Sequence, residues 1–248
     1  LLSGAYTSAG MMRDDLRTNG VLPTTEPYTA LSGKFPPIGC PGYNGGETTT
    51  PAMLAVTGND AIVDWVHVEI RNTDAAYSKV ATQNALIQRD GDIVDVNGNP
   101  LTFNCVCPGD YYVVVKHRNH LGVMTATSLP LTSTTTSVDF TTAAPVWAKP
   151  GVVNAARETN GAYRLLWPGD TRTDKNTKYN GLNNDKEPII YAVGIANPNN
   201  ILFPVYRTED ANMNAEVKYN NTNNDKNFIL DKIGVANPND VLSQHTPN

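Results

Sequence analysis

The sequence lacks long apolar runs and clusters of basic residues. No stretch approaches the roughly 20 apolar residues of a membrane-spanning helix, so we expect no membrane span. Lysine and arginine number 19 against 24 aspartates and glutamates, which gives a formal net charge of −5, and the basic residues are nowhere concentrated. Nucleic acid and anionic membranes are therefore not the expected partners, and cations suit this charge better.

The first residues, LLSGAYTSAG, have neither the basic region nor the apolar core of a signal peptide. We therefore expect that any such signal has been removed from this sequence.

Cysteine is scarce, with three residues in the chain. Cys105 and Cys107 are too close in one segment to pair comfortably, but either can reach Cys40. One thiol would then be left over. The alternative is three small unpaired thiols, so cysteine usage alone does not fix the compartment.

Catalytic motifs are also missing. The sequence has no G-x-S-x-G turn, no glycine-rich phosphate loop and no Cys–His arrangement of recognisable spacing. Asp64 and Glu69 fall on opposite faces of one expected strand, so they cannot form a glycosidase-like pair. We predict that the protein is not an enzyme.

Two histidines in the segment KHRNH, His117 and His120, lie close to Asp110 in the sequence. A catalytic zinc needs about three protein ligands, and His67 is the only other histidine before the C-terminal tail. We expect His117 and His120 to bond backbone carbonyls at a polar strand end.

The residues that are plentiful indicate β-structure. Hydrophobic residues make up 40% and charged residues 17%, with abundant Thr, Asn, Val, Gly and Pro, which favours a folded protein of strands and turns. The segment IVDWVHVEI (62–70) alternates as a strand does, and Asp90-Gly91 and Asn97-Gly98 are hairpin signals. Further strands are expected at 111–117, 121–131 and 137–143. The pattern predicts an antiparallel β-sandwich, Ig-like or transthyretin-like, over residues 1–145, with a long Gly/Pro-rich N-terminal arm.

The C-terminal region, 146–248, begins with a linker and a hairpin around Asn160-Gly161 and contains an internal duplication. KYNGLNNDK (178–186) recurs forty residues later as KYNNTNNDK (218–226), and residues 169–203 align with 209–243 throughout. Each unit is expected to be an oxygen-rich loop followed by a short helix, at roughly 186–193 and 226–233, that ends at a glycine.

A loop followed by a helix is half of a calcium-binding hand, in which oxygens come from alternating loop positions and from a carboxylate at the helix start. The second unit has Asp210, Asn212 and Asn214 at this spacing. The first unit has Arg172 at the third position, which cannot ligate and predicts a weaker site. The candidate calcium ligands are Asp170, Asp174, Asn176 and Asp185 in the first unit and Asp210, Asn212, Asn214, Glu216 and Asp225 in the second.

The pattern departs from a standard calcium loop, and a simpler interpretation exists. Asp185 and Asp225 fall three residues late, and Lys175 and Ala215 stand where the loop glycine is usual. Aspartate and asparagine also cap helices and form turns without any metal. Because a D-x-N-x-N run and a helix-start aspartate are duplicated together, we favour calcium.

The paired units resemble the calcium-binding halves of dockerin-type modules. They resemble more closely a tail of secreted Bacteroidota surface proteins, in which D-x-N-x-D-G-x-V-K-Y is followed by N-D-R-D-P-I-L. Residues 210–234 and NNDKEPII (183–190) have this form, with lysine at Lys186 and Lys226 where the tail has arginine. Four segments resemble the N-terminal part of the same group: TTEPYTAL, TGNDAIVDWVHVEIR, ALIQRDGDIVDVNG and YYVVVKHRNHLGVMT. The resemblance implies a secreted, hemagglutinin-like cell-surface protein and brings no catalytic residues.

Three functions are compatible with these observations. The first is an extracellular structural or adhesive surface protein, made rigid by calcium and able to self-associate, with the N-terminal arm packing along a neighbouring subunit. The second is a glycan-binding module in which Trp65, Tyr111, Tyr112 or Trp147 stacks on sugars. The third is a protein-docking module, which requires the repeat helices to expose Ile189, Ile190 and Val193 and their counterparts Ile229, Leu230 and Ile233.

Overall fold

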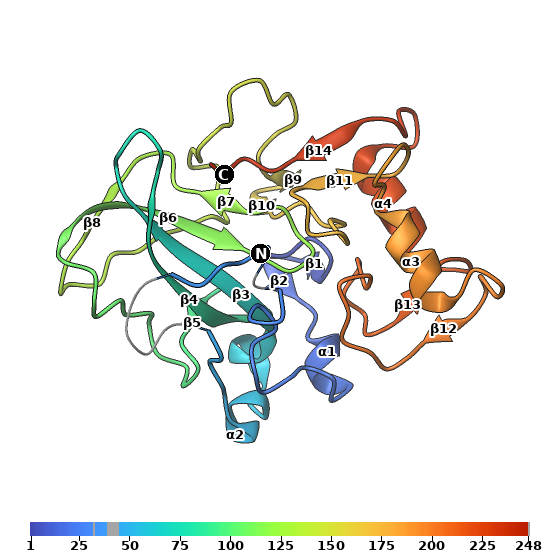
Figure 1. The fold of residues 1–248 in the computed structure, drawn as a ribbon. Helices are drawn as coiled ribbons and strands as arrows, with labels where there is room; N and C mark the ends of the chain where they lie inside the picture. The colour runs from blue at the N-terminus through green and yellow to red at the C-terminus, as the bar shows by residue number, and fades with distance from the viewer. Residues whose placement is uncertain (32, 39–44, 248) are drawn as a thin grey trace.

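The computed structural model describes residues 1–31, 33–38 and 45–247 and is mainly β, as predicted (Figure 1). Its main sheet has the strand order β5-β4-β3-β6-β7, every pair is antiparallel, and β8 pairs with the other end of β6. The strands are β3 (Ile62–Arg71), β4 (Lys79–Gln88), β5 (Ile93–Val94), β6 (Gly109–Lys116), β7 (Val123–Met124) and β8 (Leu129–Leu131).

The central strand β3 has the predicted alternation, but both of its faces are buried. Its two carboxylates are consequently paired inside the protein. Glu69, which is fully buried, accepts a hydrogen bond from Lys116 Nζ at 2.7 Å and pairs with Arg71 and Lys79. Asp64 on the other face is equally buried. Burying a carboxylate is costly unless it is paired and hydrogen-bonded, so these partners are part of the fold.

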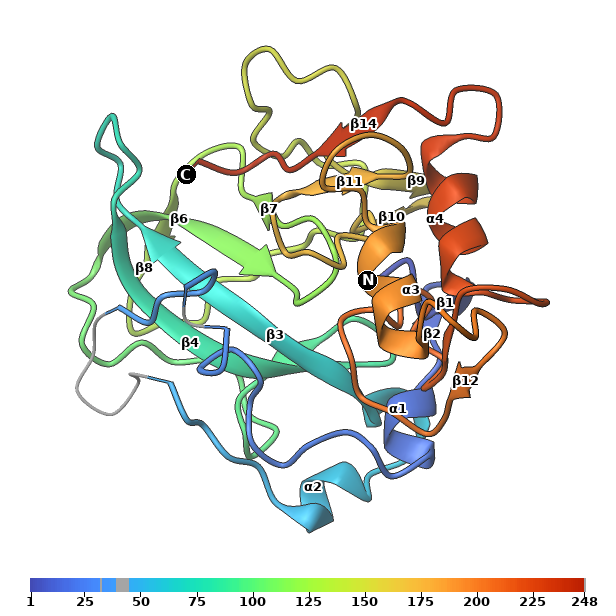
Figure 2. The ribbon, with the colours of Figure 1, turned by 45° about the vertical axis from the view of Figure 1, so that its right-hand side comes forward.

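The N-terminal arm is mostly loop, with short elements that pack on the sheet of its own chain (Figure 2). These are β1 (Tyr6–Ser8), β2 (Met11–Met12), α1 (Asp15–Thr18), α2 (Pro51–Leu54) and the 3-10 turn η1 (Gly58–Asp60). Trp65 Nε1 donates to Pro23 O at 2.9 Å, and the Tyr28 and Phe35 rings pack against His67. The described part of the arm therefore contributes side chains to the apolar core of the main sheet.

One expected strand is absent. Residues 137–143 form no strand, because Asp139 Oδ1 accepts hydrogen bonds from the Thr141 backbone N–H and hydroxyl and turns the chain there. Within the described ranges, the sheet is accompanied only by two-stranded sheets and is covered largely by loops. The hairpins at Asp90-Gly91 and Asn160-Gly161 are confirmed, the latter by β9 (Glu158–Asn160) and β10 (Tyr163–Leu165).

The duplicated units form a reciprocal pair. The first contributes β11 (Asn176–Lys178), α3 (Lys186–Val193) and β12 (Ile201–Leu202), and the second contributes β13 (Val217–Lys218), α4 (Asp225–Ile233) and β14 (Val241–Ser243). Strand β11 pairs with β14 and β12 pairs with β13, so each unit lends a strand to the other. Asparagine side chains also bond one unit to the other in both directions. Asn180 Nδ2 donates to Asn239 Oδ1, and Asn220 Nδ2 donates to Asn199 Oδ1.

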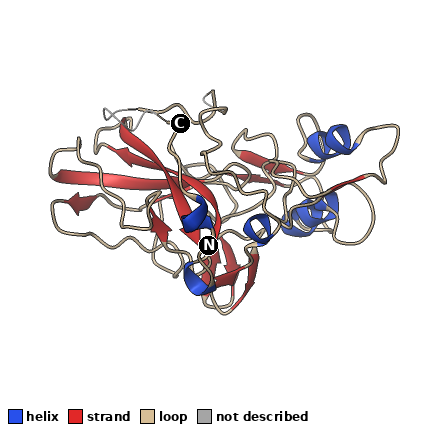
Figure 3. Cartoon of the chain, turned by 90° about the horizontal axis from the view of Figure 1, so that it is seen from below, coloured by secondary structure: helices blue, strands red, loops and turns tan. Residues whose placement is uncertain are grey.

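Both predicted helices are confirmed, and they lie side by side at the end of the molecule away from the main sheet (Figures 1 and 3). Ile189 and Val193 of α3 and Ile229 and Ile233 of α4 are buried in one apolar cluster. These four side chains therefore pack against one another within the protein, whereas Ile190 and Leu230 of the same predicted faces are half-buried. No helix in the described part of the chain has the length and apolar character needed to cross a membrane.

Buried contacts cross the expected boundary between residues 145 and 146. Met213 and Ala215 of the second unit belong to the apolar core of the sheet. Asn119 Nδ2 donates to the backbone carbonyls of Thr208 at 3.1 Å and Asp210 at 2.8 Å. The segment that follows β6 is thus bonded directly to the second repeat.

Asp64 is the centre of a polar network within this contact. Its Oδ2 accepts from His117 Nε2 at 3.0 Å and from Arg118 Nε at 3.1 Å, and its Oδ1 accepts from the Tyr206 hydroxyl at 2.7 Å. Burial disfavours the charged carboxylate, but the Arg118 charge and the bonds from His117 and Tyr206 outweigh it and lower the pKa of Asp64 to about 2.

His117 and His120 extend this network to the N-terminal segment. We expected them to bond backbone carbonyls, and they do not. His120 Nε2 accepts from the Gly4 N–H at 3.0 Å, so the proton of His120 is on Nδ1. This Nδ1 lies 3.0 Å from His117 Nδ1, which must accept, and His117 Nε2–H therefore donates to Asp64. Burial lowers the pKa of both histidines, consistent with two neutral rings.

The cysteines are distinguished by the structure. Cys105 is disulfide-bonded, whereas Cys107 is an exposed free thiol. Cys40 lies outside the described residues.

Candidate metal centres

The two candidate loops have the same backbone conformation. In the second unit, the Asp210 carboxylate accepts from the backbone N–H groups of Asn214 at 3.0 Å and Ala215 at 2.9 Å. In the first, Asp170 accepts from those of Asp174 and Lys175 at 2.8 and 2.9 Å. The carboxylate of the first aspartate of each unit thus stabilises a tight turn by accepting from the backbone N–H groups four and five residues later.

The loop geometry is maintained without the usual glycine. Lys175 has a φ of 71° and Ala215 a φ of 63°, the left-handed conformation that glycine adopts most easily. This conformation costs an ordinary residue roughly 1–2 kcal/mol. Ala215 is fully buried in the apolar core, which helps to offset that cost. The missing glycine therefore does not prevent the left-handed conformation at this loop position.

The helix-start aspartates do not cap the helices. Asn184 and Asn224 do so, accepting from the backbone N–H groups of Glu187 and Asn227. Asp225 instead accepts from Ala211 N at 2.8 Å and from Lys218 N at 2.9 Å, which directs its carboxylate back into the loop.

Asp185 accepts from Lys178 N at 2.7 Å, as Asp225 does from Lys218 N, and from Arg172 N at 3.2 Å. The three extra residues of each loop are taken up in a turn before the helix, where Asn183, Asn221 and Asn223 adopt positive φ. Asparagine tolerates this conformation better than most residues. The late spacing of the two aspartates is therefore compatible with a closed loop.

Each unit buries two aspartates close together. Asp210 and Asp225 are 0% and 1% exposed, and Asp170 and Asp185 are 3% and 1% exposed. Burial, and then the charge of Asp210, raises the pKa of Asp225 well above its usual value. Burial likewise raises the pKa of Asp210, although the charge of Arg118 opposes the shift. A bound cation would favour the charged form of both carboxylates.

The first unit has the same electrostatics. Burial, followed by the charge of Asp185, raises the pKa of Asp170 well above its ordinary range. Burial raises the pKa of Asp185 to about 7.

The third loop position distinguishes the two units. Asn212 Nδ2 donates to Asn223 O at 3.1 Å, which leaves Asn212 Oδ1 buried with no hydrogen-bond partner among the described residues. An unsatisfied buried oxygen is costly, and a hard cation would satisfy it. In the first unit, Arg172 Nε donates to Asn184 O at 3.0 Å in the same way, but the rest of its guanidinium pairs with Glu187. That position offers no oxygen.

The remaining candidates are arranged less favourably. Asp174 and Asn214 are partly buried, and each accepts from the N–H two residues on. The Asn176 oxygen accepts from the Ser243 hydroxyl, and Glu216 pairs with Lys218. The side chains of Asn176 and Glu216 are thus engaged elsewhere, and only their backbone carbonyls could serve a cation at the seventh loop position.

No three His, Cys, Asp or Glu side chains converge as metal ligands in the part of the chain that the structure describes. Each centre has two buried aspartates, supplemented by the Asn212 and Asn214 amide oxygens in the second unit and by Asp174 in the first. This donor set contains only oxygen, which suits a hard cation such as calcium. The unpaired Asn212 oxygen and the buried aspartates of the second unit fit such an ion, whereas the first unit fits it less well.

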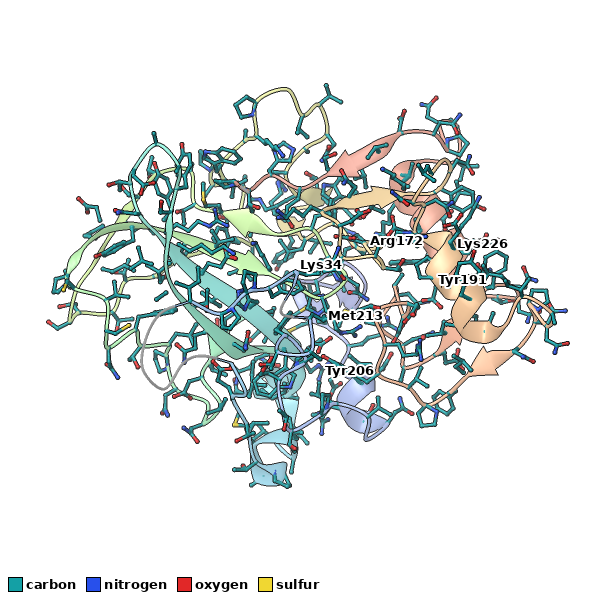
Figure 4. All side chains as sticks on the ribbon, in the orientation of Figure 1. Lys34, Arg172, Tyr191, Tyr206, Met213 and Lys226 are labelled. Carbon is teal, nitrogen blue, oxygen red and sulfur yellow. The ribbon has the colours of Figure 1, made fainter. Side chains whose placement is uncertain are left out.

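The other residues of the repeated phrase have structural roles that spacing alone did not indicate. Lys186 lies over the Tyr179 ring and Lys226 over the Tyr219 ring, at 4.2 and 4.5 Å from the ring centres. In Figure 4, Lys226 and Tyr191 lie on the outer side of the repeat helices, whereas Met213 and Tyr206 lie between these helices and the main sheet. Of the side chains of the phrase, only that of its single aspartate, Asp185 or Asp225, is a candidate ligand.

Comparison with protein-family models, with curated proteins and with solved structures finds no match to this chain. Its function is therefore inferred from the chemistry of its sites.

Proposed function

We propose that this chain is an extracellular structural or adhesive protein of a cell surface, stabilised by calcium in its duplicated C-terminal region. The second centre is the main support, because it combines the buried pair Asp210 and Asp225 with the unpaired Asn212 oxygen. Binding to a site that exists only in the folded chain stabilises the fold. Calcium would hold the loops closed, and these loops are bonded to the sheet through Asn119.

Self-association or adhesion is supported by the apolar surface of the first unit. Leu182, Tyr191 and Phe203 are 85%, 62% and 54% exposed. The second unit has Thr222, Asp231 and Ser243 at the corresponding positions. Because the repeat fold forms in the second unit without them, apolar side chains at these positions suggest a contact surface.

The assignment of residues 1–145 to an Ig-like or transthyretin-like sandwich is part of this proposal. The antiparallel order of the main sheet supports it. An experimental structure in which no second sheet faces β3 would rule it out.

Calcium-dependent assembly can be tested by light scattering after size exclusion and by negative-stain imaging, in calcium and after chelation. We expect oligomers or filaments that dissociate when calcium is removed. A monomer under both conditions would contradict self-association and leave a soluble adhesive module. A calorimetric titration showing no calcium uptake would contradict the metal centres themselves.

The residue at the third loop position should set calcium affinity. Arg172→Asn gives the first unit the oxygen that Asn212 supplies in the second, and we expect its calcium affinity to rise about tenfold, or about 1.4 kcal/mol. The reciprocal Asn212→Arg should lower the affinity of the second unit by at least as much. Calorimetry can resolve the two sites, and unfolding in chelator provides the control for the lost Arg172–Glu187 pair.

A further inference from the structure

A polar groove runs beside the second unit. It has a volume of about 540 Å³ and lies between the N-terminal segment, the second repeat loop and α4. A neighbouring hollow of about 470 Å³ shares Asp231 and Lys232 with it and extends it to Trp167. We propose that this groove binds an oligosaccharide, and that the second calcium centre shapes its floor.

The groove contains polar groups that the fold does not use. The side chains of Asn160, Asn227 and Asp231 make no hydrogen bond or ion pair within the described ranges, although each lines the groove. Amides and carboxylates can each bond two neighbouring sugar hydroxyls. Few protein contacts would have to be broken when such a ligand binds.

Apolar rings lie among these polar groups. Phe228 lines the groove, and Lys232 lies 5.2 Å above its ring while its Nζ bonds Glu158 Oε1 at 2.8 Å. Tyr6 lines the groove from the N-terminal segment, and Trp167 lines the extension. Half-buried aromatic rings beside amides provide both the apolar surface and the directional bonds that a sugar ring requires.

The duplication provides an internal comparison. The first unit has Glu187, Pro188, Tyr191 and Ala192 where the second has Asn227, Phe228, Asp231 and Lys232. The two loop aspartates and the buried apolar positions of the helix are common to both units, whereas these groove residues are not. The groove chemistry is therefore particular to the second unit and is not needed for the repeat fold.

The groove also adjoins the candidate calcium ligands. Asn212 and Asn214 line it, and Arg13 Nη2 bonds both Gly4 O and Asn212 O, which ties the two walls together. This coupling rests on the proposed calcium site. If it holds, removing calcium should weaken sugar binding as well as the loop.

The test uses the full chain in calcium on an array of defined oligosaccharides, followed by calorimetry with the best binder. Asn227→Ala and Asp231→Ala are each expected to weaken binding about tenfold, since each removes bonds to the ligand. Asp240→Ala, at an exposed aspartate of the same unit that does not line the groove, is the matched control and should bind normally.

Two results would overturn the proposal. One is the absence of any array signal in calcium. The other is unchanged affinity in both groove variants, which would place the ligand elsewhere, for example at the Tyr77, Tyr112 and Trp147 rings. A separate calcium titration without sugar distinguishes these failures from failure of the metal centre, because the groove variants leave Asp210 and Asp225 intact.

Discussion

Adding calcium to the metal-free protein is expected to raise its melting temperature by roughly 10 °C. A site filled at about 1,000 times its Kd contributes about 4 kcal/mol, and each kcal/mol shifts the midpoint of a chain this size by about 2–4 °C. The physical reason is the pair of buried aspartates in each unit, whose charges a cation would neutralise. Calorimetric unfolding in calcium and in chelator measures the shift.

Asp225→Asn should remove the contribution of the second unit. In calcium the variant should melt well below the wild type, because one of the two charges that hold the ion is gone. In chelator the difference should be small, since the lost acceptor for backbone N–H groups is offset by removal of the charge beside Asp210.

The matched control for this variant is Asp240→Asn, an exposed aspartate of the same unit that should leave the calcium response unchanged. Equal destabilisation of Asp225→Asn with and without calcium would show that Asp225 has only a structural role.

Asp64→Asn is expected to destabilise the protein by about 3 kcal/mol, because it leaves the buried Arg118 guanidinium without its counter-charge. The amide also presents a donor to groups that are themselves donors. Since Tyr206, in the segment just before the second repeat, donates to the same carboxylate, the repeat region and the sheet should loosen together. Chemical denaturation with urea measures the loss.

The pH dependence of this variant provides a second test. The pKa of Asp64 lies at about 2 in the folded protein and at 3.8 when unperturbed, so its contribution is fully present above pH 4 and is lost as the pH falls toward 2. This contribution is about 2 kcal/mol, and Asp64→Asn should lack it across that window. Asp110→Asn, an exposed position in the same sheet, is the control. Parallel pH profiles for wild type and Asp64→Asn would contradict this role.

Several features were predictable because they depend on local patterns. The alternation of residues 62–70 predicted the central strand, and Asp90-Gly91 predicted its neighbouring hairpin. The forty-residue repeat predicted two equivalent loop–helix units with the correct helices. Turn chemistry and periodicity act over a few residues, so the local structure that they predict does not depend on distant parts of the chain.

Contacts between distant residues were not predictable in the same way. Residues 137–143 have a strand-like composition, but a strand forms only where a partner edge is free, and Asp139 turns the chain first. The histidines of KHRNH gave no signal that they would meet Asp64 and Gly4, because those partners lie 53 and 116 positions away. Trp65 was a candidate for stacking on a sugar, but its side chain is fully buried and cannot contact one.

For this protein, the sequence by itself determined the two oxygen-rich loops, because each loop closes on its own backbone around one aspartate. Tertiary structure alone decided what those loops adjoin. Segments far apart in the sequence must come together to form the strand pairs between the units and the groove beside α4. The same holds for the hydrogen bonds from Asn119 and Arg13 to the second loop. The paired aspartates are a candidate cation site, and not only turn residues, because they are buried. Burial depends on the tertiary structure.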